Sequence, residues 1–322
     1  MAGKEYIQML RMFDFYVEEI DEEKISSYPC DVDVAIFHPA FYAIPRATQY
    51  IKSCNKKIIL GAFDVADTSA ISRISIQLLN RLFDFVVVPS VFAQSVFYKS
   101  GTTIPVFVVN HPYREELFNK CEKEIPTGKG LNILFFLLHS GYRKGADILA
   151  EALKILSKEG INFTLIIKRL SNLDPFLSLL KQFPHIEIEE FLDVPCLGEL
   201  YRKVDVLALP SRGGGFERPG LEALAVGTPV VAPAYGSWTE YIPVQLLARV
   251  EIFEKVFKDN PVHIGLGPRA DPADFAKKLM EAPTIDISRH VARIRERFKL
   301  ENIAKTQMAR VANYILGLLA KK

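Results

Sequence analysis

The sequence predicts an α/β protein built from two doubly wound domains in tandem. Short apolar runs rich in β-forming residues alternate with stretches of helical period, which is the rhythm of βαβ units. These runs are apolar nearly throughout instead of alternating, as is typical of parallel strands covered on both faces. The length of 322 residues suits about two domains at roughly 150 residues each.

The first domain is predicted to hold four strands with helices between them. The expected strands are 33–39, 57–63, 84–90 and 105–112. Helical spacing fills 71–83 and 91–101, and the second of these helices ends on a stop signal at Gly101.

Residues 114–130 break this rhythm and are predicted to link the domains, because they are charged and have no sustained apolar face. Strands are then expected at 132–140, 161–170, 185–192, 204–211 and 228–234, and helices at 145–158, 175–183 and 219–226. Asp271 and Pro272 form a helix start, and 299–319 has the pattern of an amphipathic last helix. We place the domains at 1–120 and 121–298, followed by a C-terminal helix at 299–322.

Composition and charge narrow the class of protein. Apolar residues make up 49% and charged residues 24%, as in an ordinary soluble protein. The 40 Lys and Arg against 38 Asp and Glu leave a net charge of +2, which argues against a nucleic-acid binder. No apolar run approaches the roughly 18 residues of a membrane span, and the N-terminus lacks a secretory pattern, so a cytoplasmic chain is expected. Aromatic residues such as Phe41 and Tyr42 leave peripheral membrane contact open, with core packing favoured.

Neither the cysteines nor the one D-x-D sequence predicts a metal site. Cys30, Cys54, Cys121 and Cys196 lack metal-knuckle spacing, so isolated reduced thiols are expected. The D-x-D sequence at 31–33 precedes its strand, away from the end where ligands bind in such sheets. We therefore expect no metal site.

A glycine-rich loop follows the strand at 204–211. Gly213, Gly214 and Gly215 present bare backbone just before a helix, where N–H groups favour a phosphate or a sugar hydroxyl. A flexible glycine turn is the simpler interpretation. Glu217 and Glu222 favour the functional one, because carboxylates accept hydrogen bonds from polyol hydroxyls.

A basic turn follows the strand at 132–140. His139, Ser140, Arg143 and Lys144 crowd the start of the next helix, where cations oppose the helix dipole unless an anion is bound. A diphosphate would supply that anion, with solvated surface cations as the alternative.

Two carboxylates, Asp64 and Asp67, follow the strand at 57–63. At a strand's carboxyl end they are candidates for catalysis. Capping of the next helix by Asp67 or Thr68 is the alternative interpretation, and these carboxylates alone are a weak signal.

The stretch 210–242, PSRGGGFERPGLEALAVGTPVVAPAYGSWTEYI, resembles the signature of family 4 (group 1) retaining glycosyltransferases of the GT-B fold. Three more segments are similar to this family in the right order. They are VFVVNHPYREELF, RKGADILAEALKIL and GLGPRADPADFAKKL.

The resemblance implies GT-B architecture, with two Rossmann-like domains facing across a cleft and a last helix that crosses back to the N-terminal domain. The nucleotide-sugar donor is then expected mainly on the C-terminal domain. Lys144 matches the family's phosphate lysine with Arg143 assisting it, and His139 falls near the phosphate arginine. Glu222 matches the glutamate expected on the ribose hydroxyls. The predicted donor-binding set is His139, Ser140, Arg143, Lys144, Lys168, Gly214, Gly215, Phe216 and Glu222.

This chain departs from the family pattern at two places. Gly214 stands where the family has its first glutamate, while Glu217 occupies a position that is usually glycine. We hypothesise that Glu217 supplies the missing carboxylate, and we count it with Asp64 and Asp67 as catalytic. The N-terminal domain is also reduced: it shows no opening strand with a glycine-rich loop, and Phe63 or Asp64 stands where the family's histidine would fall.

The sequence therefore predicts a retaining, metal-independent glycosyltransferase without a cofactor, with Asp64 or the leaving phosphate as the base. The donor would be a UDP-, GDP- or ADP-sugar. The acceptor could be a glycan, a lipid-linked sugar, a protein or a small molecule. The alternative is a non-catalytic GT-B-like protein that binds a nucleotide sugar or a glycan.

Overall fold

The computed structural model describes residues 2–21, 24, 28–54, 57–138, 140–170 and 174–321. The chain divides into two compact units. Unit 1 contains Met1–Pro112, Asp259–Gly265 and Arg297–Lys322, and unit 2 contains Tyr113–Lys258 and Leu266–Glu296. The sequence predicts domain boundaries at 120 and 298, and in the structure Arg297–Lys322 belong to unit 1.

Unit 1 is built on a four-stranded parallel sheet in the order β1-β2-β3-β4. Its strands are β1 (Val34–Phe37), β2 (Ile59–Phe63), β3 (Phe85–Val88) and β4 (Val106–Val108). All four lie inside the runs that the sequence predicts as strands. Because the strand order follows the chain order, this sheet has no point at which the order reverses.

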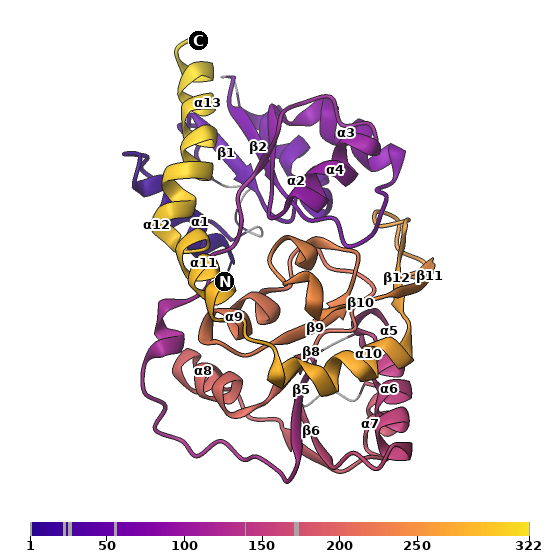
Figure 1. Cartoon of the computed structure of the whole chain (residues 1–322). Helices are drawn as coiled ribbons and strands as arrows, with labels where there is room; N and C mark the ends of the chain where they lie inside the picture. Colours follow the sequence, from indigo (N-terminus) through magenta and orange to yellow (C-terminus); the bar gives the residue numbers. More distant parts are fainter. Residues whose placement is uncertain are drawn as a thin grey trace. The chain divides into compact units, whose positions relative to one another are not determined.

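Helices cover both faces of this sheet (Figure 1). One group is α2 (Ala40–Ser53), α3 (Arg73–Leu82) and α4 (Val91–Lys99), whose apolar side chains form one buried cluster with Leu60, Val86 and Val88. The other group is α1 (Ala2–Arg11), α12 (Leu300–Ile303), a π-helical turn (Ala304–Met308) and α13 (Ala309–Leu319). Tyr314 of α13 packs on Phe85 and Phe107. The sequence predicts α3, α4 and the last helix but not α1 and α2.

Unit 2 is built on a six-stranded parallel sheet in the order β10-β9-β8-β5-β6-β7. The strands are β5 (Leu131–Leu137), β6 (Phe163–Arg169), β7 (His185–Ile188), β8 (Val206–Ala208), β9 (Val230–Pro233) and β10 (Leu247–Ala248). The order reverses where β5 lies between β6 and β8. In open α/β sheets, ligands bind outside the carboxyl ends of the strands at this reversal.

The unit 2 sheet is accompanied by helices and by a separate β-ribbon. The helices are α5 (Gly141–Lys144), α6 (Ala146–Lys158), α7 (Leu177–Leu180), α8 (Val194–Lys203), α9 (Arg218–Val226), α10 (Pro272–Glu281) and α11 (Ser288–Arg297). Short 3₁₀ helices span Glu115–Phe118, Ser237–Glu240, Val244–Leu246 and Ala282–Thr284. β11 (Val250–Lys255) and β12 (Leu266–Ala270) form an antiparallel ribbon that the sequence does not predict. Asp271 caps α10 as expected, accepting from the N–H groups of Ala273 and Asp274.

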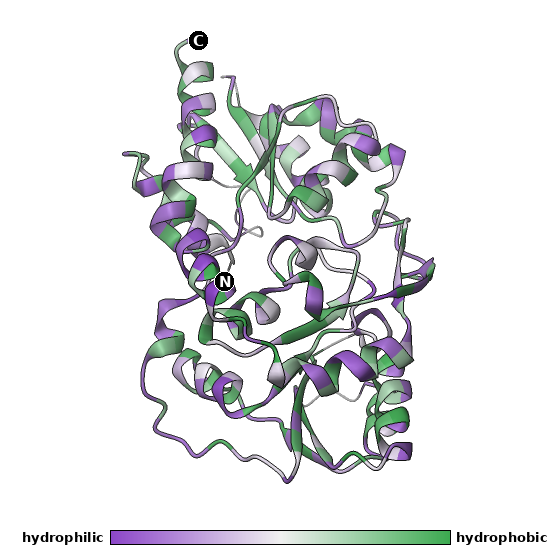
Figure 2. Cartoon of the chain, viewed as in Figure 1, coloured by the Kyte–Doolittle hydropathy of each residue, from purple (hydrophilic) through white to green (hydrophobic). Residues whose placement is uncertain are grey.

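Hydrophobic residues gather in the strands, and polar residues dominate the outer faces of the helices (Figure 2). Among the described residues, no helix combines the length and apolar character that crossing a bilayer requires.

The cysteines form two disulfides, so the expectation of isolated reduced thiols is wrong. Cys30 bonds to Cys54, and Cys121 bonds to Cys196 at the start of α8. The pairs are 24 and 75 residues apart in sequence, whereas their Cα atoms lie only 5.4 and 4.6 Å apart. Spacing along the chain excludes a metal knuckle but carries no information on such distant pairing. The second bond fastens the predicted linker to unit 2.

Candidate functional site

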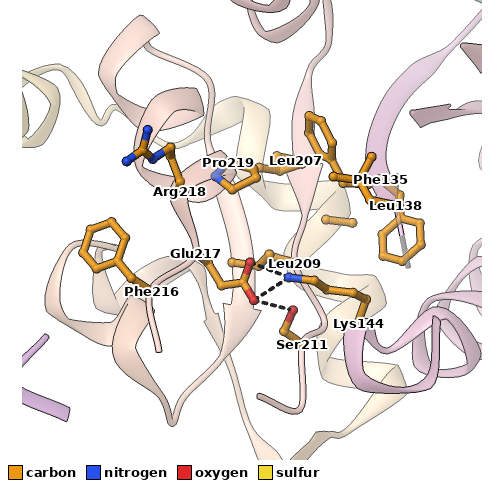
Figure 3. Close-up of a pocket in the computed structure, with 12 residues that line it drawn as sticks. Phe135, Leu138, Lys144, Leu207, Leu209, Ser211, Phe216, Glu217, Arg218 and Pro219 are labelled. Atoms are coloured by element: carbon orange, nitrogen blue, oxygen red, sulfur yellow. Dashed lines mark hydrogen bonds and ion pairs between the residues drawn. The ribbon is translucent and has the colours of Figure 1, made fainter. Parts of the chain in front are cut away.

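The candidate site lies in unit 2, outside the carboxyl ends of β5 and β8, where the strand order reverses. Loops from these two strands enclose a cavity of about 220 Å³. Its wall includes Phe135, Leu138, Lys144, Leu209, Ser211 and Glu217 (Figure 3). The basic turn and the glycine-rich loop, which the sequence singles out separately, thus meet at one cavity.

Lys144 and Glu217 form an ion pair in this cavity. Both carboxylate oxygens of Glu217 lie 2.7 Å from Lys144 Nζ, and Ser211 Oγ donates to Oε1 over 3.4 Å. The Glu217 side chain is only 4% exposed and that of Lys144 17%. The two predicted site residues are therefore partners of each other.

The carboxylate of Glu217 fills the space beside Gly214. A Cβ atom at Gly214 would lie 2.4 Å from Glu217 Oε1, closer than non-bonded atoms approach. The surrounding loop is held by Ser237 Oγ, which donates to the Gly214 carbonyl, and by Tyr241 Oη, which donates to the Glu217 carbonyl. A side chain at position 214 and this position of Glu217 exclude each other.

Arg143 and Ser140 shape the turn that carries Lys144. Arg143 Nη1 donates to the Gly213 carbonyl over 3.0 Å, so this cation fastens the turn to the glycine-rich loop. Ser140 is exposed and adopts a left-handed conformation with φ of 56°. Gly215 and Phe216 follow in the loop, and the Phe216 ring packs on Tyr241. His139 lies outside the described residues.

Arg212 is a residue of the site that sequence reasoning missed. Its side chain is 1% exposed and donates to both oxygens of Asp147 over 2.7 Å and to Glu254 over 2.5 Å. It also donates to the Tyr142 carbonyl, and its guanidinium lies over the Tyr142 ring. Arg212 therefore ties the start of the glycine-rich loop to α6 and to the β11–β12 ribbon. The only signal in the sequence was a lone arginine next to glycines.

The carboxylate of Glu222 binds the side chains of Arg114 and Tyr201, and Glu222 does not line the cavity. Arg114 binds both of its oxygens, over 2.7 and 2.9 Å, and Tyr201 Oη donates over 3.3 Å. The side chain of Glu222 is 1% exposed. Burial, together with the charge of Glu222, raises the pKa of Tyr201 well above its usual value. In the structure, the residue that the resemblance places on a ribose joins α9 to Arg114 of the predicted linker.

Lys168, near the end of β6, also binds groups of the protein itself. Its Nζ donates to the carbonyl of Arg169 on β6 and to the carbonyls of Ile188 and Glu190 at and just after the end of β7. Burial lowers the pKa of Lys168. It does not line the cavity at Lys144.

In unit 1, Asp64 caps α2 from the end of the neighbouring strand β2. The N-cap residue of α2 is Pro39, which has no side-chain hydrogen bond to offer. Asp64 instead accepts from the N–H groups of Phe41 over 2.9 Å and of Val65 over 2.8 Å. Burial raises the pKa of Asp64 to about 7 against these hydrogen bonds. The residue considered as a base thus satisfies a helix start.

Asp67 and Phe63 lie on either side of Asp64, Asp67 in the loop after β2 and Phe63 at the end of that strand. Asp67 is half-buried, and its charge contributes to the raised pKa of Asp64. α3 begins only at Arg73 after Ser72, so neither Asp67 nor Thr68 is its N-cap. The Phe63 ring packs on Tyr6 and His38, with centroids 4.6 and 4.7 Å apart. The sequence does not predict that Tyr6 and His38 contact Phe63.

We expect Asp64 to make stability fall as the pH rises. The folded-state pKa of about 7 lies above the ordinary value of 3.8, so the folded chain binds the extra proton. The resulting stabilisation is complete below pH 3.8 and is lost as the pH rises through 7. Between pH 5 and 8 the loss amounts to about 2–3 kcal/mol.

Urea unfolding at pH 5 and 8 checks this expectation. The variant Asp64→Asn should lack this part of the pH dependence, whatever its absolute stability. Asp84→Asn is the matched control, because Asp84 also accepts a backbone N–H in unit 1, from Leu60, and it should keep the wild-type slope. Equal slopes in Asp64→Asn and the wild-type protein would show that Asp64 is ionised throughout this range.

Comparison with known proteins relates this geometry to a family. The family model for group 1 glycosyl transferases matches residues 131–281. "Putative glycosyltransferase 45" of Sulfolobus islandicus filamentous virus (isolate Iceland/Hveragerdi) is 31% identical over 279 residues, covering 82% of this chain and 77% of the relative. "Uncharacterized protein 356" of Sulfolobus islandicus rod-shaped virus 1 is 29% identical over 302 residues, covering 87% and 83%.

Solved structures are similar in fold at low sequence identity. The sucrose-phosphate synthase of Thermosynechococcus elongatus has a TM-score of 0.70 and 15% identity, with 94% of this chain and 78% of that chain covered. Alr3699/HepE of Anabaena, solved in complex with UDP and glucose, has a TM-score of 0.65 and 17% identity, with 91% and 80% covered. These likenesses confirm the predicted α/β fold class, with Rossmann-like units of GT-B type.

Proposed function

The chain belongs to the group 1 glycosyltransferases, and we propose that it moves a sugar from a nucleotide-diphosphate donor to a hydroxyl acceptor, with retention and without a metal ion. The observation that carries this proposal is the Lys144–Glu217 pair at the reversal of the unit 2 sheet. There the ammonium group of Lys144 and the carboxylate of Glu217 meet at one cavity. A departing diphosphate and a hydroxylated sugar require these two groups.

Lys144 is proposed to stabilise the leaving diphosphate. Its ammonium group reaches the cavity from the turn after β5, and the exposed fraction of its side chain is small. A cation in such a site interacts strongly with the charge that develops as the glycosidic bond breaks. The backbone of Gly215 and Phe216 is proposed to contact the same ligand. Arg143 keeps the two loops together through the Gly213 carbonyl.

Glu217 is proposed to accept hydrogen bonds from hydroxyls of the donor sugar. Its carboxylate occupies the space beside Gly214, where the family pattern has a glutamate. Compared with the family pattern, this chain carries the carboxylate three positions later in the same loop. Because Asp64 is a buried cap, we assign the acceptor's proton to a phosphate oxygen of the leaving group.

The donor class is proposed as UDP-, GDP- or ADP-sugars, with UDP-sugars tested first because the Anabaena protein was solved with UDP and glucose. The acceptor is proposed to present a hydroxyl group, whether on a glycan, a lipid-linked sugar, a protein or a small molecule.

A screen of UDP-, GDP- and ADP-sugars with EDTA present throughout tests the proposal. Thermal stabilisation by one donor, followed by slow release of its nucleoside diphosphate, is the expected result. Stabilisation without turnover, even with candidate acceptors, would favour a protein that binds nucleotide sugars without transferring them. If no nucleotide stabilises the protein, the cavity at Lys144 is not a donor site.

A further inference from the structure

Lys144 and Glu217 form an ion pair in the wall of the cavity, and Arg218, a further charged residue of that wall, points away from Glu217 (Figure 3). Glu217 has two contacts of 2.7 Å to Lys144 Nζ and a longer one to Ser211 Oγ. Most other side chains of the wall are apolar, among them Phe135, Leu138 and Leu209. A buried carboxylate in such surroundings depends on the partners it has.

A phosphate group that approaches Lys144 competes with Glu217 for the same ammonium group. If the ammonium turns to the phosphate, Glu217 loses its charged partner and keeps only Ser211. It then lies buried next to a second anion. Leaving one member of a buried ion pair without its partner is strongly unfavourable. The ligand therefore binds well only if it also supplies hydrogen-bond donors to Glu217.

From this geometry, and on the basis of the function proposed above, we infer that Glu217 makes the cavity selective for an intact sugar nucleotide over the free nucleoside diphosphate. A sugar nucleotide carries hydroxyl groups that donate to Glu217 while its diphosphate takes Lys144. The nucleoside diphosphate takes Lys144 but leaves Glu217 without replacement donors. The same residue thus favours binding of the donor and release of the product.

Dissociation constants for the two ligands, measured by calorimetry without acceptor, test this inference. UDP and UDP-glucose are the first pair, replaced by the matching pair if the screen identifies another donor. The wild-type protein should bind the sugar nucleotide at least about ten-fold more tightly, or roughly 1.4 kcal/mol. Glu217→Gln removes the charge at nearly constant shape. It should tighten diphosphate binding about ten-fold and bring the two constants close together.

Two control variants separate this effect from a general disturbance. Glu217→Asp keeps the carboxylate and should keep the preference for the sugar nucleotide. Glu187→Gln makes the same chemical change in a carboxylate that pairs with Arg169 on β6 and does not line the cavity, and it should leave both constants unchanged.

The outcomes distinguish the inference from the proposed function. A wild-type protein that binds the diphosphate as tightly as the sugar nucleotide overturns the inference without any variant. An unchanged ratio in Glu217→Gln does the same. If the wild-type protein binds neither ligand of any donor pair, the proposed function falls, and the inference falls with it.

Discussion

Replacing Arg212 by methionine should lower the free energy of unfolding of unit 2 by about 3 kcal/mol or more, because it leaves two carboxylates without their common cation. The Arg212 side chain is 1% exposed, and it binds Asp147 through two hydrogen bonds and Glu254 through one. It also joins the loop of the candidate site to the Tyr142 carbonyl. We therefore expect lower stability together with weaker donor binding, measured by urea unfolding and by calorimetry.

Two further variants test whether the geometry of Arg212 is responsible. Arg212→Lys keeps the charge but loses the planar fork, and it should fall between the wild-type protein and Arg212→Met. Arg269→Met removes an arginine that also pairs with two carboxylates, Glu151 and Glu251, each about half exposed. Its cost should stay near or below about 1 kcal/mol. If Arg212→Met loses no more free energy of unfolding than Arg269→Met, the Arg212 network does not anchor the loop.

Moving the carboxylate from position 217 to position 214 should restore activity that either single change destroys. Glu217→Gly removes the group proposed to bind the donor sugar. Gly214→Glu places a Cβ atom 2.4 Å from Glu217 Oε1 and adds a second negative charge. Each single variant should lose about 10- to 100-fold in kcat/KM, from the roughly 1.5–3 kcal/mol that a hydrogen bond to a charged group contributes. The double variant should recover most of this loss.

Steady-state kinetics of the four proteins form a double-mutant cycle that measures the coupling between the two positions. Gly215→Glu combined with Glu217→Gly is the control, because it moves the carboxylate to the wrong position and should stay impaired. A Gly214→Glu, Glu217→Gly protein that is no more active than Glu217→Gly would contradict the idea that position 217 has taken over the role of position 214.

Much of the fold follows from local patterns in the sequence. The strands β1 to β9 lie inside or near the predicted apolar runs, because a strand buried on both faces needs such a run wherever it occurs. Asp271 caps α10 because an aspartate followed by proline favours a helix start in any context. α2 escaped prediction because Pro39 provides no capping side chain and Pro45 lies within the helix. Its cap, Asp64, comes from another part of the chain.

The residue types of the candidate site could also be predicted, but their partners could not. Lys144 and Glu217 were expected at a ligand, and in the structure they bind each other. Glu222 was expected on a ribose and is held by Arg114, 108 residues away in sequence. The cysteines, expected as separate thiols, are paired.

The sequence by itself determined the two parallel sheets, the loops at the ends of β5 and β8 and the chemical groups in them. These features depend on residues only a few positions apart, whose spacing sets which face is buried and where a helix starts. Only the tertiary structure decided which charges meet. The sheet order brings β5 beside β8, although 68 residues separate the end of β5 at Leu137 from the start of β8 at Val206. Buried charges then pair with whichever opposite charge packing brings within reach, because a buried charge without a partner is costly.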